Sequence, residues 1–201
     1  MLPTTLLNMI KSFEMTNIDK TSLHYFAMIG DIENLSNNKA SWNDNTCAYA
    51  AQYGQLECLK YLHENGCPWN KNLCILATEF GQLECFKYAY ENGCPWDEYA
   101  CDSAVINGQL ECLKYLHENG CPCDVWTAVN AASNGQLECL KYLKEQKCSW
   151  DENTCYFSAK NGQLECLQYA YENGCPIDIS NCITNATFKN HDNIVQYLLS
   201  S

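Results

Sequence analysis

Cysteine is the residue type whose chemistry stands out in this chain of 201 residues, which contains 16 of them. Thiols at this density are typical of small proteins held together by disulfide bonds, and they could also hold zinc or act as nucleophiles. The segment Met1–Ser12 lacks the basic start and the apolar stretch of a secretory signal. We therefore expect a cytoplasmic chain whose thiols stay reduced.

The best metal candidate in the sequence is the group His117, Cys121 and Cys123, with Cys148 as a fourth ligand. Soft ligands this close in sequence could hold zinc. However, His63 and Cys67 repeat the spacing of the first two without a third ligand. A structural role is therefore favoured, and we expect neither a metal nor a cofactor.

Carboxylates could perform acid–base chemistry, but they recur at regular intervals with lysines between them at helical spacing. This pattern is typical of a solvated helical face. Histidine–glutamate pairs such as His63-Glu64 lack the second histidine of a zinc protease, and the glycines form no phosphate-binding loop. We expect no enzymatic activity.

A repeat organises all of these residues. The segment GQLECLKYLHENGCPW begins at Gly54, and close copies begin 27 residues apart, at Gly81, Gly108, Gly135 and Gly162. Positions related by this period are called a column below. All ten glycines fall in two columns, which indicates one short unit copied many times.

Each copy predicts two helices. Leu56, Leu59 and Leu62 form one apolar helical face, which ends at Gly66 and Pro68. A shorter helix is predicted before each copy, with Asp97, Asp151 and Asn153 among the N-cap candidates. A column of small residues would let the two helices pack closely: Ala27, Ala50, Ala77, Ala104, Ala131 and Ser158. No strand alternation is present, so the fold class is all-α.

The segment Thr21–His24, followed by Ala27 and Gly30, resembles the TPLH…A…G opening of an ankyrin repeat. Each later copy fits the same frame through G-x-L-E-x-L-x-x-L-x-x-x-G, as in Gly54–Gly66. The motif ENGCPW resembles those of short, cysteine- and asparagine-rich ankyrin-like proteins of large DNA viruses that infect amoebae. The resemblance implies an ankyrin-like helix-turn-helix solenoid. Its finger loops would be shortened, because each unit is about six residues shorter than the usual repeat.

We predict a single ankyrin-like repeat domain over residues 1–201. It comprises an N-terminal cap helix (1–19), a degenerate first repeat (20–40), five 27-residue repeats (41–175) and a C-terminal capping repeat (176–201). The first twelve or so residues also resemble the opening of an F-box, which would make the chain a substrate adaptor for a ubiquitin ligase. In the capping repeat Asn190 replaces the turn glycine.

In the ankyrin frame, three cysteine columns occupy core positions, where a free cysteine acts as a small apolar residue. Members of one column would lie about 10 Å apart, too far for a disulfide. Pairs between columns remain open. Cys123 departs from the frame, because it replaces a tryptophan of the column Trp42, Trp69, Trp96 and Trp150. The alternative function is a thiol-based metal or redox protein.

The copies differ most in the first helix and the loop before it. In the ankyrin family these positions line a concave groove, so the resemblance implies a non-enzymatic scaffold that binds a protein partner there. With the viral resemblance, the partner would be a host protein, and we expect a monomer. The candidate binding residues are Tyr53, Lys71, Glu79, Phe80, Glu98, Tyr99, Ile106, Asn107, Trp126, Asn134 and Lys160. Among them, Tyr53 and Phe80 are expected to be unpacked aromatic residues that anchor the partner.

The charge balance excludes some partners. The formal net charge is −12, and all 12 basic residues are lysines. We therefore expect no binding to nucleic acid or to an anionic membrane. One turn also departs from the pattern: Lys147 and Ser149 replace the usual glycine and proline, which predicts a softer joint between the fourth and fifth copies.

Overall fold

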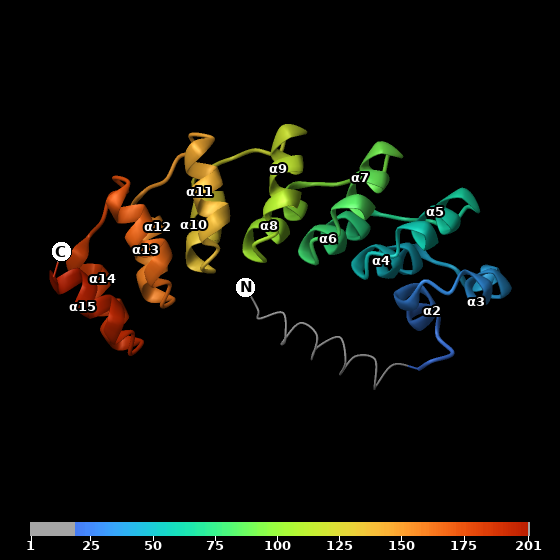
Figure 1. The fold of residues 1–201 in the computed structure, drawn as a ribbon, viewed down its shortest axis with the longest axis horizontal. Coiled ribbons are helices and arrows are strands. Elements are labelled where there is room, and N and C mark those ends of the chain that lie inside the picture. Colours follow the sequence, from blue (N-terminus) through green and yellow to red (C-terminus); the bar gives the residue numbers. More distant parts are fainter. Residues whose placement is uncertain (1–18, 201) are drawn as a thin grey trace. The chain divides into compact units, whose positions relative to one another are not determined.

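The computed structural model describes residues 19–200, which are helical and contain no strand. The all-α prediction is confirmed, whereas the predicted cap helix falls almost entirely on residues outside this range. The chain divides into two compact units, residues 1–104 and 105–201, and each is described by itself. Figure 1 shows helices α2 to α15 in chain order.

Each repeat is a pair of helices joined by a tight turn. The first helices are α2 (Leu23–Ile29), α4 (Asp44–Gln52), α6 (Lys71–Glu79), α8 (Glu98–Ile106), α10 (Val125–Ser133), α12 (Glu152–Lys160) and α14 (Ile179–Phe188). The second helices are α3 (Ile32–Asn37), α5 (Leu56–Glu64), α7 (Leu83–Glu91), α9 (Leu110–Glu118), α11 (Leu137–Glu145), α13 (Leu164–Glu172) and α15 (Asp192–Ser200). A short 3-10 helix, η1 (Lys39–Ser41), follows α3. The helix-turn-helix prediction is confirmed, but in the 27-residue copies the first helix is not the shorter one, because α4 and α5 both have 9 residues.

Polar side chains set where the first helices begin. The Asp151 carboxylate accepts a hydrogen bond from the backbone N–H of Asn153 at 2.9 Å, and Asp124 caps α10 in the same way through Thr127. Such caps satisfy backbone donors that a helix start leaves without partners. Asp151 is thus the predicted cap, whereas Asn153 lies inside α12 and is not a cap.

The turn inside each pair also joins neighbouring repeats. Gly108 has φ +70°, and Gln136 of the following copy packs against it. The Gln136 side chain donates from Nε2 to the carbonyl of Ile106 at 2.8 Å. In the first unit Gln55 makes the equivalent bond to the carbonyl of Met28 at 2.9 Å. The capping repeat uses His191 instead, whose Nε2 lies 3.2 Å from the carbonyl of Lys160, and Asn190 takes the left-handed position with φ 60°.

Small and apolar side chains form the core between the helices. In the repeat of α4 and α5, Leu59 and Leu62 are fully buried, and Cys58 is 2% exposed. Every member of the small-residue column from Ala27 to Ser158 is 0% exposed, as predicted. Close approach of the helix backbones needs small side chains at this position, because interiors are packed without voids.

The cysteine columns lie in this core, as predicted. Cys47, Cys74 and Cys155 are 0% exposed. The prediction of reduced thiols is wrong for Cys123 and Cys148, which form a disulfide with a Cα–Cα distance of 5.6 Å. Cys101 and Cys121 do not carry free thiols either. The physical reason for the first pair is the stacking of one repeat on the next, which brings the two loops together.

The loops between repeats contain no strand in the described part of the chain, so the finger is reduced to a short connection, for example residues 65–70. Such a connection turns through a left-handed residue, which is glycine in most copies. Lys147 holds this place with φ 62°, as its position in the sequence predicts.

Replacing Lys147 by glycine is expected to raise the free energy of unfolding by about 0.5–1 kcal/mol, because a side chain in the left-handed region is strained. Asn190→Gly serves as the matched control and should gain less, since asparagine tolerates this conformation. Urea denaturation measures both. A Lys147→Gly variant no more stable than the parent would contradict the assigned strain.

Candidate functional site

The predicted binding residues fall in two rows, one at each end of the first helices. Lys71, Glu98 and Tyr99 of the first unit and Trp126 of the second lie in the first turns of α6, α8 and α10, and we call these equivalent positions the N-terminal row. The other candidates lie at or just after the last turns and form the C-terminal row. A helix of 9 residues, such as α6, is about 13 Å long, so the two rows are separate surfaces.

The N-terminal row is the exposed one. The side chains of Tyr99 and Trp126 are 57% and 59% exposed, and both occupy the same column of the repeat. In the first unit Lys71 Nζ lies 2.8 Å from Asp97 Oδ2 and 5.6 Å from the centre of the Tyr99 ring. Lys71 and Tyr99 therefore come together as a charged and aromatic surface. The hydrogen bond that Lys71 donates to the Asp97 carboxylate also raises the pKa of Lys71, which keeps its positive charge.

Most of the C-terminal row is engaged with neighbouring structure. Tyr53 and Phe80 were expected to be unpacked aromatics, but both are half-buried C-cap residues, and the Tyr53 ring lies 6.1 Å from that of His24. Asn134 donates from its side-chain amide to the carbonyl of Asn130 within α10. The Lys160 ammonium lies 5.5 Å from the ring of Phe157. Glu79 and Asn107 are half-buried, and Ile106 is 38% exposed.

Backbone bonding gives this end of the helices a structural role. In the second unit the carbonyls of Ile106, Ser133 and Lys160 are hydrogen-bonded by side chains of the following repeat. Satisfying these carbonyls ties each repeat to the next, because the last carbonyls of a helix have no partner inside it. The C-terminal row is thus weaker as a binding surface than the N-terminal row.

The second unit contains a pocket that the sequence did not predict. It lies between α12 and α14 and is lined by Glu152, Asn153, Tyr156, Asp178, Asn181 and Cys182. Two carboxylates beside an aromatic ring suit the side chain of a lysine or arginine. Variation within the chain could have revealed it, since the column of Tyr156 contains Ala48, Ile75, Asp102, Val129 and Ile183.

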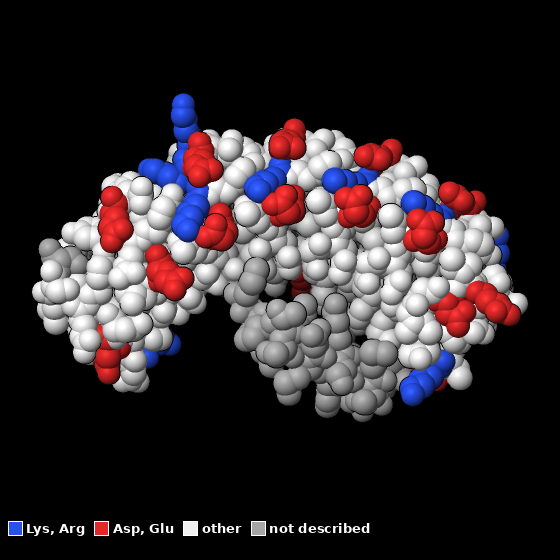
Figure 2. Space-filling model, viewed as in Figure 1, with Lys and Arg blue, Asp and Glu red and all other residues white. Residues whose placement is uncertain are grey.

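Charged side chains on the second helices pair with one another. Lys60, Lys114 and Lys141 each lie 2.7 Å from a glutamate three residues earlier, and Lys87 lies 2.9 Å from Glu84. Figure 2 shows lysine side chains, in blue, next to carboxylates, in red, on the visible face. The interpretation as a solvated helical face is thus supported, because such exposed pairs are structural and weak.

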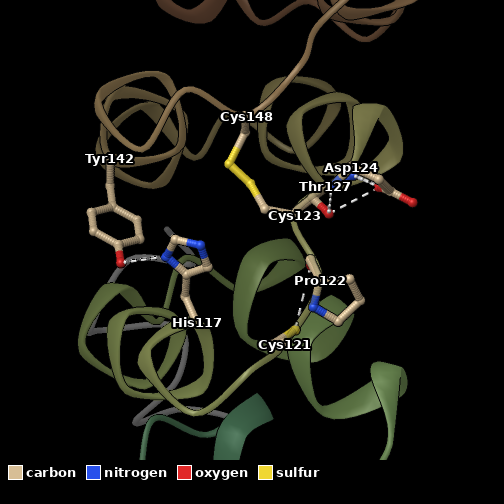
Figure 3. Close-up of a disulfide and its surroundings, with 8 residues drawn as sticks. All are labelled: His117, Cys121, Pro122, Cys123, Asp124, Thr127, Tyr142 and Cys148. Carbon is tan, nitrogen blue, oxygen red and sulfur yellow. Dashed lines mark hydrogen bonds between the residues drawn. A yellow bond between two sulfur atoms is a disulfide. The ribbon is translucent and has the colours of Figure 1, made fainter.

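The zinc candidates have other partners. His117 Nδ1 and Tyr142 Oη share a hydrogen bond of 3.0 Å, and Cys123 is bonded to Cys148 (Figure 3). Within residues 19–200 no three histidine, cysteine or carboxylate side chains converge as a metal site would require. In the same range, no helix is both long and apolar enough to cross a membrane.

The comparisons agree with this architecture. The family model for ankyrin repeats (3 copies) matches residues 47–127, 73–154 and 128–201. Among solved structures, the human ASB11 ankyrin repeat domain is similar with a TM-score of 0.65 and 21% identity, over 77% of this chain and 84% of that one. This likeness shows the fold. No curated protein sequence matches.

Ankyrin repeats are generally scaffolds for protein–protein interaction and are typically without enzymatic activity. Their helix pairs, left-handed turns and packed small residues are those described above. The matched segments cover more than half of the sequence, and the chain belongs to the ankyrin repeat family.

Proposed function

We propose that this chain binds a protein partner through the N-terminal row of each unit, with Tyr99 as the main contact in the first unit and Trp126 as the main contact in the second. The single observation that supports this most strongly is the exposure of both rings in one column, at 57% and 59%. Large aromatic side chains are the residues that most often dominate binding energy at protein interfaces. More than half of each of these residues is exposed, so much of its apolar surface is accessible to a partner.

The charges indicate the chemistry of the partner. The chain carries a formal net charge of −12, and the pocket between α12 and α14 presents Glu152 and Asp178 beside Tyr156. A partner segment that offers apolar side chains together with lysine or arginine would complement both features. The charges of Lys71 and Asp97 neutralise each other, so this ion pair contributes no net charge to the binding surface.

Capture of partners on the immobilised chain tests the proposal. Trp126→Ala and Tyr99→Ala should each weaken binding of a captured partner about thirtyfold, the effect of losing an interface residue worth about 2 kcal/mol. Phe188→Ala is the matched control, because Phe188 is 80% exposed but lies at the opposite end of its helix. Equal loss with Phe188→Ala, or no loss with the other two, would contradict the assigned surface.

A host partner, the monomeric state and a cytoplasmic location stay predictions. The adaptor function depends on the first 19 residues, of which 1–18 lie outside the described range. The thiol-based alternative is less well supported, because the columns of cysteine are buried in the core.

A further inference from the structure

The cysteine that follows the inter-repeat turn makes the same contact in three of the repeats. Its thiol donates to a backbone carbonyl 24 residues earlier, at the start of the preceding repeat. This bond is 3.5 Å from Cys67 to Asn43, 3.3 Å from Cys94 to Asn70 and 3.1 Å from Cys175 to Asp151. The repeat therefore places this sulfur against the loop that precedes the first helix.

The residue just before that carbonyl is tryptophan in these repeats, namely Trp42, Trp69 and Trp150. For Cys148 the corresponding residue is Cys123. Cys123, in the tryptophan column, thus lies next to Cys148, whose position is set by the packing of the repeats. The Cα atoms are 5.6 Å apart, within the usual range for a disulfide, and the two loops are bonded (Figure 3).

The same joint lacks three features that order the others. Cys123 replaces a tryptophan, Lys147 replaces a glycine and Ser149 replaces a proline. In the intact repeat of His63, the imidazole stacks on Trp69 with ring centres 3.8 Å apart. His117 occupies the equivalent position but has Cys123 in place of that ring. The covalent bond is therefore found where the stacking of histidine on tryptophan is missing.

Solvent can reach this pair. Cys123 is half-buried between the exposed residues Pro122 and Asp124, and Cys148 is 9% exposed. By contrast, Cys139 and Cys166 are 1% exposed within the core. Exchange requires a thiolate to approach the sulfur atoms, so accessibility decides which sulfurs react.

We propose that Cys123 and Cys148 form a reversible redox site that controls the order of the joint between α9–α10 and α11–α12. A small dithiol reduces the bond: the two cysteines gain two electrons and two protons, and the dithiol becomes a disulfide. Glutathione disulfide restores it, taking the two electrons and leaving as two glutathione thiols. The oxidised joint is ordered by the bond, and the reduced joint has neither the bond nor the tryptophan.

Equilibration of the folded, full-length chain in glutathione buffers tests this, with alkylation and mass spectrometry as the readout. The peptides of Cys123 and Cys148 should pass between linked and alkylated forms together as the buffer becomes more reducing. Hydrogen exchange of residues 122–127 and 146–151 should be at least tenfold faster in the reduced chain.

Two variants separate this site from general effects of reduction. Cys101 and Cys121 are also oxidised, and reduction affects them too. The effect of the Cys123–Cys148 bond is therefore the difference in hydrogen exchange between reduced and oxidised chain that the Cys123→Ser variant does not show. Cys123→Trp restores the column residue and should slow exchange at the joint in both buffers, which also shows that the variant folds. Three results would each overturn the proposal. Cys123 and Cys148 could stay alkylated in the most oxidising buffer, their bond could resist excess dithiothreitol, or hydrogen exchange could be equal in both states.

Discussion

Raising the pH from 8 to 10 is expected to unfold this protein, because five of its buried thiols resist ionisation. Burial raises the pKa of Cys85, Cys139 and Cys182 to about 11, and that of Cys58 and Cys166 to about 12. The ordinary value for a thiol is about 8.5. The unfolded chain therefore releases these protons at a lower pH than the folded chain does.

The sign follows from proton linkage. Below pH 8.5 both states hold the protons, and the stability is complete; between the ordinary and the raised pKa only the folded state holds them, so stability falls with rising pH. Each such thiol lowers the free energy of unfolding by about 1.4 kcal/mol per pH unit, and the five together lower it by about 7 kcal/mol per pH unit. Because a domain of this size is stable by about 5–15 kcal/mol, the loss is sufficient for unfolding near pH 10.

Urea denaturation at pH 7.5, 8.5, 9.5 and 10, with reductant throughout, measures this dependence. Cys139→Ala is the control: it should be less stable at pH 7.5 but should lose about 1.4 kcal/mol less per pH unit. A free energy of unfolding that is unchanged between pH 8 and 10 would show that the thiols are not the buried groups described here.

Substituting alanine at Gly108 should destabilise the second unit by about 3 kcal/mol, since two costs combine. Alanine is strained at φ +70°, by about 1–2 kcal/mol. Its Cβ would also lie 2.8 Å from Cδ of Gln136, whose amide donates to the carbonyl of Ile106. Displacing that amide leaves a carbonyl without its partner, at a cost of about 1–3 kcal/mol.

Gly120→Ala has the first cost without the second. Gly120 also has a positive φ, +94°, but no atom lies within 4 Å of the position of its Cβ. The Gly120→Ala variant should therefore lose only about 1–2 kcal/mol of its free energy of unfolding. Urea denaturation measures both variants. Equal losses in the two variants would mean that the contact with Gln136 contributes nothing. When both glycine substitutions are repeated in a Gln136→Ala background, most of the difference between their losses should disappear.

Local rules explain why so much of the fold could be predicted. A glycine column, a leucine face and an N-cap aspartate such as Asp151 each act over a few residues, and their 27-residue period multiplies the signal. Even Lys147 in the left-handed region follows from its column alone. The binding surface was predicted less well, because exposure depends on how neighbouring repeats pack. Tyr53 and Phe80 looked unpacked in sequence and proved half-buried, whereas Tyr156 and Asp178 line a pocket whose only signal in the sequence is the variation within the column of Tyr156.

The sequence by itself determined the all-α repeat, its period, the buried cysteine columns and the family. Only the tertiary structure decided which variable side chains face solvent, and that Cys123 meets Cys148. The physical reason is that helix periodicity and caps are properties of adjacent residues, whereas this disulfide joins residues 25 positions apart. Their distance is set by the stacking of one repeat on the next, which brings the tryptophan column of one loop against the cysteine column of the following loop.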